Sequence, residues 1–152
     1  MAYGIELLAD VRAFPRSRHH PQFNAENLAA QLEEVGIRYR HMPELGGRRK
    51  PLAESINSGW DHPAFRGYAD YAIGERFALA YAELRELARE RRTCLMCAEA
   101  LWWRCHRRLL ADRLLAEGFA VQHIHPDGRR SPHRLTPFAR QRPDGSLSYP
   151  PP

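Results

Sequence analysis

The stretch Ile5-Glu6-Leu7-Leu8-Ala9-Asp10-Val11-Arg12 decides the fold. Its first five residues are a short, largely apolar run that ends at Asp10, which predicts a buried β-strand. Asp10 and Arg12 are two residues apart, so their side chains share one side if the strand continues through them. A carboxylate beside a guanidinium suits anchoring of a substrate, or a base that is kept ionised. It suits an internal ion pair that ties down the loop equally well.

Helices and further strands alternate along the chain after this first strand. The residues 37–42 alternate apolar and basic side chains, and the runs 93–97 and 119–124 are apolar, so each predicts a strand. Apolar residues at helical spacing predict helices over 24–35, 63–71, 75–92 and 100–117. Strands that alternate with helices of this length predict an α/β fold with three layers. We expect a mainly parallel sheet with helices on both faces.

The regular pattern stops at Pro126, so we divide the chain into an α/β domain over 1–125 and a C-terminal segment over 126–152. Repeated prolines in this segment exclude a regular helix. Its five arginines against two aspartates give a balance of +3 (5 minus 2). The segment is either an extended strap across the domain or a mobile basic tail. Because it contains apolar side chains, we expect a strap to about Phe138 and mobility near the end.

The composition restricts the classes of function. The chain has 152 residues with 22 arginines, one lysine and a net charge of +5. The arginine excess reflects either codon bias in a GC-rich genome or the two-pronged binding of phosphates and carboxylates by guanidinium groups. Three cysteines do not fit a disulfide framework, so we expect a reducing, cytoplasmic setting. No apolar run approaches the ~20 residues of a membrane-spanning helix, so we expect no membrane partner.

Polar and glycine residues follow each predicted strand. In an open parallel sheet, ligands bind beyond the carboxyl ends of the strands, so these residues predict a pocket for an anionic ligand. The expected pocket is lined by Asp10, Arg12, Gly46, Gly47, Cys97, Glu99, Arg107 and His123.

Four of these residues, together with the neighbouring Arg48, predict binding of the anion. We assign Arg12 and Arg107 to holding it. The Gly46-Gly47 pair lets a backbone approach a phosphate, with Arg48 alongside, although an ordinary turn explains the same pair.

Cys97 and Glu99 are the leading catalytic candidates. We expect Cys97-Ala98-Glu99 at the point where a strand turns into a helix. Unpaired backbone N–H groups at a helix start favour a thiolate. Cys97 is then a nucleophile, and Glu99 or Asp10 a general acid or base. An inert buried cysteine beside a helix-capping glutamate explains the same residues. His123 is a further catalytic candidate, for which a structural hydrogen bond is the alternative.

Four residues superficially supply the ligands of a zinc ion, namely Cys94, Cys97, Cys105 and His106. Positions three apart on a strand point to opposite faces, and adjacent helical positions diverge by about 100°. We therefore expect no metal and no cofactor.

Short motifs occur in order between about Ile5 and Arg140. They are Asp10-Val11-Arg12, Gly36-Ile37, Leu45-Gly46-Gly47, Cys97-Ala98-Glu99, Cys105-His106-Arg107 and Val121–Ile124. In these motifs the chain resembles the bacterial and archaeal domain-of-unknown-function family number four-eight-eight. The resemblance implies an α/β protein and carries no settled activity. Family members begin with a further strand and helix, which we expect to be missing because Tyr3-Gly4-Ile5 looks like a helix end followed by a strand.

Two classes of function fit these residues. The leading hypothesis is a small cytoplasmic enzyme, hydrolase- or transferase-like, that acts on an anionic nucleotide-like or nucleic-acid-derived substrate. The alternative is a non-catalytic nucleic-acid-binding module that uses the Arg104 and Arg108 stripe and the basic segment from Arg129 to Arg142.

Overall fold

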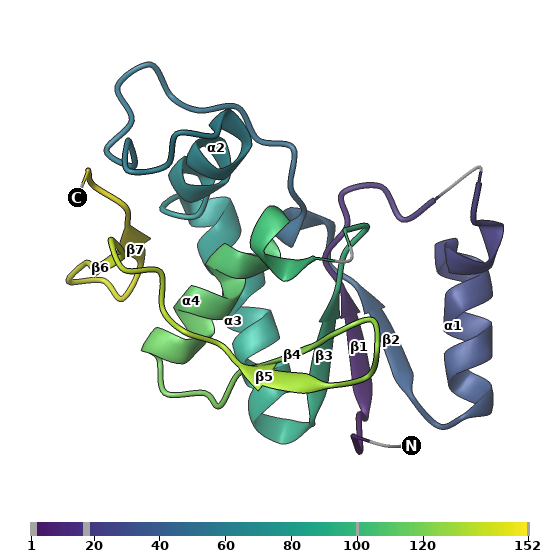
Figure 1. Ribbon diagram of the computed structural model, residues 1–152. Helices are drawn as coiled ribbons and strands as arrows, with labels where there is room; N and C mark the ends of the chain where they lie inside the picture. Colours follow the sequence, from purple (N-terminus) through teal and green to yellow (C-terminus); the bar gives the residue numbers. More distant parts are fainter. Residues whose placement is uncertain (1–2, 17–18, 100, 152) are drawn as a thin grey trace. The chain divides into compact units, whose positions relative to one another are not determined.

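The computed structural model describes residues 3–16, 19–99 and 101–151 (Figure 1). It divides into two compact units. Unit 1 comprises residues 1–46 and 79–98, and unit 2 comprises residues 47–78 and 99–152. Two expected features fall wholly or partly outside the described residues: the helix end over the first four residues, of which Met1 and Ala2 are not described, and the helix start at Ala100.

Unit 1 contains a three-stranded parallel sheet in the order β2-β1-β3. The strands are β1 (Leu7–Asp10), β2 (Arg38–His41) and β3 (Thr93–Met96). Leu7 and Ala9 are buried in the central strand, as its apolar sequence predicts. At the carboxyl end of β1, Asp10 lies opposite His41 on one side and Met96 on the other. The predicted mixture of helices and strands is therefore confirmed, and so is a parallel sheet for these three strands.

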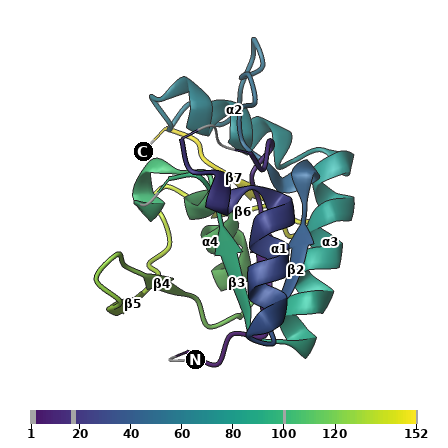
Figure 2. The ribbon, with the colours of Figure 1, turned by 90° about the vertical axis from the view of Figure 1, so that its right-hand side faces the viewer.

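The helix α1 (Ala25–Glu34) leads into β2, and Figure 2 shows it alongside that strand. It ends where the sequence predicts, because Gly36 adopts a φ of +77° that glycine reaches without strain. The Ile37 amide then donates to the Leu32 carbonyl at 2.9 Å and closes the last turn. Unit 1 also contains two single-turn 3-10 helices, η1 (Pro21–Phe23) and η2 (Pro43–Leu45). The later residues of α3 (Glu75–Glu90) belong to it as well.

Unit 2 combines helices with two antiparallel hairpins. Besides the first residues of α3, its elements are α2 (Pro63–Tyr71), the 3-10 helix η3 (Trp102–Arg104), α4 (Arg107–Ala116), β4 (Gln122–Ile124), β5 (Arg130–Pro132), β6 (Arg140–Gln141) and β7 (Leu147–Ser148). The hairpins pair β4 with β5 and β6 with β7. Tyr68, Leu110 and Tyr149 are among the most deeply buried side chains of this unit.

The prediction that 119–124 adds a fourth strand to the parallel sheet is wrong. β4 pairs with β5 in an antiparallel hairpin. Gly128 adopts a φ of +88°, and the His125 amide donates to the Arg129 carbonyl at 2.8 Å, so the chain turns tightly and returns beside β4. In β4 only His123 is buried, which is typical of a hairpin with one solvated face.

The helix predicted over 100–117 begins later than expected. Cys105 has extended backbone angles (φ −134°, ψ 152°), which separate η3 from α4. Since α4 starts at Arg107, the prediction that Cys97 and Glu99 stand at a helix start is wrong.

The C-terminal segment has no helix among its described residues 126–151, as its prolines predict. Thr136, Leu147 and Tyr149 are buried, so packing reaches further along the segment than Phe138. The domain boundary at 125/126 stays a prediction, and so does the arrangement with helices on both faces of the sheet. Among the residues that the structure describes, no helix is both long and apolar enough to cross a membrane.

Candidate functional site

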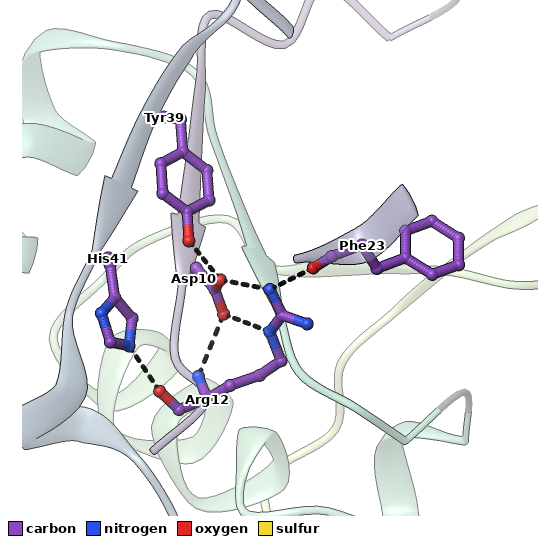
Figure 3. Close-up of polar contacts among 5 residues, drawn as sticks. All are labelled: Asp10, Arg12, Phe23, Tyr39 and His41. Atoms are coloured by element: carbon purple, nitrogen blue, oxygen red, sulfur yellow. Dashed lines mark hydrogen bonds and ion pairs between the residues drawn. The ribbon is translucent and has the colours of Figure 1, made fainter. Parts of the chain in front are cut away.

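Asp10 and Arg12 form a buried ion pair at the carboxyl end of β1 (Figure 3). Nε of Arg12 donates to Oδ1 of Asp10 at 2.8 Å, and Nη2 donates to Oδ2 at 2.7 Å. The backbone amide of Arg12 also donates to Oδ1, at 3.1 Å. Asp10 is 0% exposed and Arg12 7% exposed, so the structure brings these two predicted residues together in a two-pronged, desolvated contact.

Three further residues of unit 1 hold this pair. The Tyr39 hydroxyl donates to Oδ2 of Asp10 at 2.5 Å, and Nη2 of Arg12 donates to the Phe23 carbonyl at 2.8 Å. Nε2 of His41 donates to the Arg12 carbonyl at 2.7 Å. Tyr39 and His41 come from β2, which runs parallel to β1 in a register that sets their rings beside the pair (Figure 3).

The surroundings determine the charge of each partner. Burial raises the pKa of the Asp10 carboxyl, but the hydrogen bonds from Arg12 and Tyr39 outweigh burial and leave that pKa below its ordinary value. The hydrogen bond to Asp10 raises the pKa of Arg12. Burial, followed by the hydrogen bond to Asp10, raises the pKa of Tyr39. At neutral pH, Asp10 is therefore an ionised group whose two oxygens already accept hydrogen bonds.

One edge of the Arg12 guanidinium stays open. Nη1 points away from Asp10 in Figure 3, and no acceptor among the described residues pairs with it. Since Asp10 and Phe23 hold the other nitrogens, the N–H groups of Nη1 have a fixed direction. A guanidinium held in this way is suited to bind a phosphate or carboxylate.

A second polar network surrounds Asp112 of α4, in unit 2. Oδ1 of Asp112 accepts hydrogen bonds from Nε2 of His133 at 2.7 Å and from the Thr136 amide at 3.1 Å. Oδ2 accepts the Tyr149 hydroxyl at 2.8 Å. Nδ1 of His133 lies 2.7 Å from Nε2 of His123. The side chains of Asp112 and His133 are fully buried. Hydrogen bonds therefore connect Asp112 in the core of unit 2, through His133, to His123.

Neighbouring residues determine the position of the His123 ring and its charge. The Trp102 ring stacks on it with centroids 4.0 Å apart and planes 6° apart. Burial, followed by the positive charges that His133 and Arg107 can carry, lowers the pKa of His123 from 6.5 to about 4. Nη2 of Arg107 donates to the Glu99 carbonyl at 2.6 Å. Thus the predicted residues Glu99, Arg107 and His123 all belong to unit 2, where Arg107 influences His123 electrostatically.

The predicted glycine pair is packed against other residues. A Cβ added to Gly46 would lie 2.7 Å from the Ala13 backbone, and one added to Gly47 would lie 3.0 Å from Nδ1 of His106. Close packing against backbone therefore explains Gly46 without a ligand, whereas a side chain at Gly47 would meet only the His106 ring. Arg48 is exposed and has a φ of +63°, a conformation that few residues other than glycine adopt. Approach of a phosphate to this segment stays a prediction.

The cysteines are thiols that lie in both units. Cys97 follows β3 and is half-buried, whereas Cys105 is buried with its Sγ 3.5 Å from Nδ1 of His106. Within the described ranges, no three His, Cys, Asp or Glu side chains are grouped as ligands for a metal ion.

A family model described as "Domain of unknown function DUF488" matches residues 1–114, which is most of the chain. The chain belongs to the DUF488 family. This membership confirms the resemblance seen in the motifs from Asp10 to Arg107. No curated protein and no solved structure matches the chain.

The region that matches DUF488 contains the Asp10–Arg12 pair and Asp112, whereas His123 and His133 follow it. Sequence reasoning missed Tyr39, His41, Asp112 and His133 as parts of these networks. For Asp112 a signal exists, because it directly follows the buried helical residues Leu109, Leu110 and Ala111. A carboxylate at such a position indicates a buried hydrogen-bond partner. No local signal identifies His133 as that partner.

Proposed function

We propose that this DUF488 protein is an enzyme, of the hydrolase or transferase type, that binds an anionic nucleotide-like or nucleic-acid-derived substrate through Arg12. The observation that carries the proposal is the fixed guanidinium whose Nη1 has no acceptor among the described residues. Its place at the carboxyl end of the central parallel strand supports the proposal, because ligands of α/β proteins bind at these ends.

Within this proposal Asp10 holds Arg12 and does not transfer protons. Both oxygens of Asp10 are engaged, and its lowered pKa keeps it ionised. An arginine that is already ordered loses little conformational entropy when a ligand binds, which favours affinity. Cys97 and Glu99 stay our candidates for nucleophile and proton-transfer residue, in the reducing, cytoplasmic setting that the three thiols suit.

Replacing Arg12 by Lys should weaken the binding of a nucleoside 5′-monophosphate at least about tenfold, or about 1.4 kcal/mol. Lysine offers a single ammonium group, so it cannot contact Asp10 in two places and hold a second edge toward a ligand. Isothermal titration calorimetry measures the affinity. Arg89→Lys is the matched control, because the Arg89 side chain is exposed and contacts only Glu86 among the described residues.

A second test of binding through Arg12 uses the wild-type protein. In the wild-type protein, the Arg12 side-chain N–H resonances should shift when the nucleotide is added, and those of Arg89 should not. Equal affinities for the wild type and both variants, or unshifted Arg12 resonances, contradict binding through Arg12.

The catalytic part of the proposal has its own test. Glu99→Gln should abolish turnover while the unfolding transition stays unchanged, because Glu99 is exposed. Titration of thiol reactivity against pH tests Cys97 as nucleophile: an activated thiolate reacts at a pH well below about 8.5. Reactivity that appears only near that pH assigns Cys97 to packing.

The nucleic-acid-binding alternative rests on exposed arginines of the C-terminal segment, namely Arg129, Arg130, Arg134 and Arg140. The predicted basic stripe is weaker support, because Nε of Arg108 donates to Thr136 at 3.1 Å and its guanidinium lies over the Trp60 ring. A nucleic-acid-binding module should show DNA or RNA affinity that falls steeply with salt and is lost without these four charges. An enzyme that acts through Arg12 should keep its turnover when they are neutralised.

A further inference from the structure

We propose that Asp112, His133 and His123 form a proton relay in unit 2 and that Nδ1 of His123 is the proton-accepting atom of an acid–base site. The site would take a ligand that carries a hydroxyl group beside a negative charge. This inference does not depend on Arg12, which lies in unit 1.

The hydrogen bonds determine where the protons of the relay lie. The oxygens of Asp112 accept every hydrogen bond that they make with His133, Thr136 and Tyr149, as a carboxylate does. Nε2 of His133 therefore carries a proton, and its Nδ1 accepts in the neutral ring. The facing Nε2 of His123 then carries a proton too, so that Nδ1 of His123 has the free lone pair.

Nδ1 of His123 is available to a ligand. No residue in the described part of the chain forms a hydrogen bond with this nitrogen, and His123 keeps 9% of its surface exposed. The stacked Trp102 ring and the bond to His133 hold the imidazole in one plane and one direction. An oriented histidine with an oriented partner behind it is the arrangement that general base catalysis uses.

Arg107 supplies the positive charge that indicates an anionic ligand. Its Nη2 donates to the Glu99 carbonyl, but its Nε is buried and has no partner among the described residues. The Arg107 guanidinium acts electrostatically on His123, so it would attract an anionic ligand bound at His123. A phosphate group offers both an oxygen acceptor for Arg107 and a P–O–H donor for His123.

The proposed proton transfer leaves His123 neutral, because His123 gains one proton and gives up another. The ligand O–H gives its proton to Nδ1 of His123, and the proton on Nε2 of His123 moves to Nδ1 of His133. The ligand is left as an oxyanion near Arg107, and the positive charge rests on His133 beside the Asp112 carboxylate. The groups that act electrostatically on His123 are His133, Arg107, His125 and Asp112. His133, Arg107 and His125 disfavour a positive charge on His123. In the relay that charge instead lies on His133, which is bonded to the Asp112 carboxylate.

Nuclear magnetic resonance of the protein labelled with ¹⁵N at histidine tests the relay directly, with inorganic phosphate as the probe. At about pH 8 the spectra should show His123 protonated at Nε2 and unprotonated at Nδ1. Phosphate should shift Nδ1 of His123 and leave exposed His19 unchanged. On acidification, His123 should exchange one tautomer for the other while His133 becomes doubly protonated.

Two variants separate a relay from a merely structural contact. Arg107→Gln should reduce the phosphate-induced shift of Nδ1 at least about tenfold at equal phosphate concentration, because the guanidinium that attracts the anion is gone. Asp112→Asn should abolish the tautomer exchange, and Asp61→Asn, at an exposed position, should preserve it.

The wild-type spectra decide the proposal even if Asp112→Asn fails to fold. A proton on Nδ1 of His123 at about pH 8, independent titration of His123 and His133, or a phosphate shift no larger at His123 than at His19 would each overturn it. The predicted tautomer with the phosphate shift supports it, whatever the outcome for Arg12.

Discussion

Replacing Asp112 by Ala should lower the free energy of unfolding by about 3–5 kcal/mol. Asp112 is fully buried and accepts hydrogen bonds from His133, Thr136 and Tyr149, which are buried as well. Alanine leaves three buried donors without an acceptor, and each unsatisfied donor costs about 1–3 kcal/mol. Urea unfolding followed by circular dichroism measures the change.

Asp61→Ala is the matched control for this loss. Asp61 is an exposed carboxylate of the same unit, so its removal should change the free energy of unfolding by no more than about 0.5 kcal/mol. Tyr149→Phe should fall between the two, at about 1 kcal/mol, because it removes only the hydroxyl that bonds Asp112. A loss below about 1 kcal/mol for Asp112→Ala would show that the network contributes little to stability.

Lowering the pH from about 6.5 to about 4 should reduce the free energy of unfolding by up to about 3 kcal/mol through His123 alone. The unfolded chain takes a proton at His123 near its ordinary pKa of 6.5, whereas the folded chain takes one up at Nδ1 of His123 only near a pKa of about 4, and the relay then passes the Nε2 proton to His133. Between these values the unfolded state binds more protons, so the free energy of unfolding falls as the pH falls. Asp10, whose pKa lies below the ordinary value of 3.8, loses its stabilising effect only at lower pH.

His123→Gln should flatten this part of the stability curve, whereas His19→Gln, at an exposed position, should leave the slope unchanged. Urea unfolding at a series of pH values gives both slopes. An unchanged slope in His123→Gln would mean that His123 titrates normally in the folded protein.

The sequence predicted the parts of unit 1 that depend on neighbouring residues. The apolar run before Asp10 predicted the central strand, and Gly36 predicted the end of α1. The spacing of Asp10 and Arg12 predicted that they share one side, and the structure joins them as an ion pair. Whether the pair also binds a ligand is the part that sequence reasoning left open.

Both errors concern choices that the local sequence leaves open. The apolar run before His123 resembles a sheet strand, but the turn at Gly128 pairs it with β5. The helix around Arg107 was expected to start earlier, but extended Cys105 interrupts it. Local propensity is similar for both outcomes, and tertiary packing selects between them.

The sequence by itself determined the central strand, the shared side of Asp10 and Arg12 at its end and the membership of DUF488, because these depend on residues close together in the sequence. Only the tertiary structure decided that Asp112 meets His133, 21 positions later, and Tyr149, 37 positions later. A carboxylate in a buried helix face must find a donor, but the sequence does not indicate which distant donor folds against it. That choice follows from the turns and packing that bring α4, the β4–β5 hairpin and the C-terminal segment into one unit.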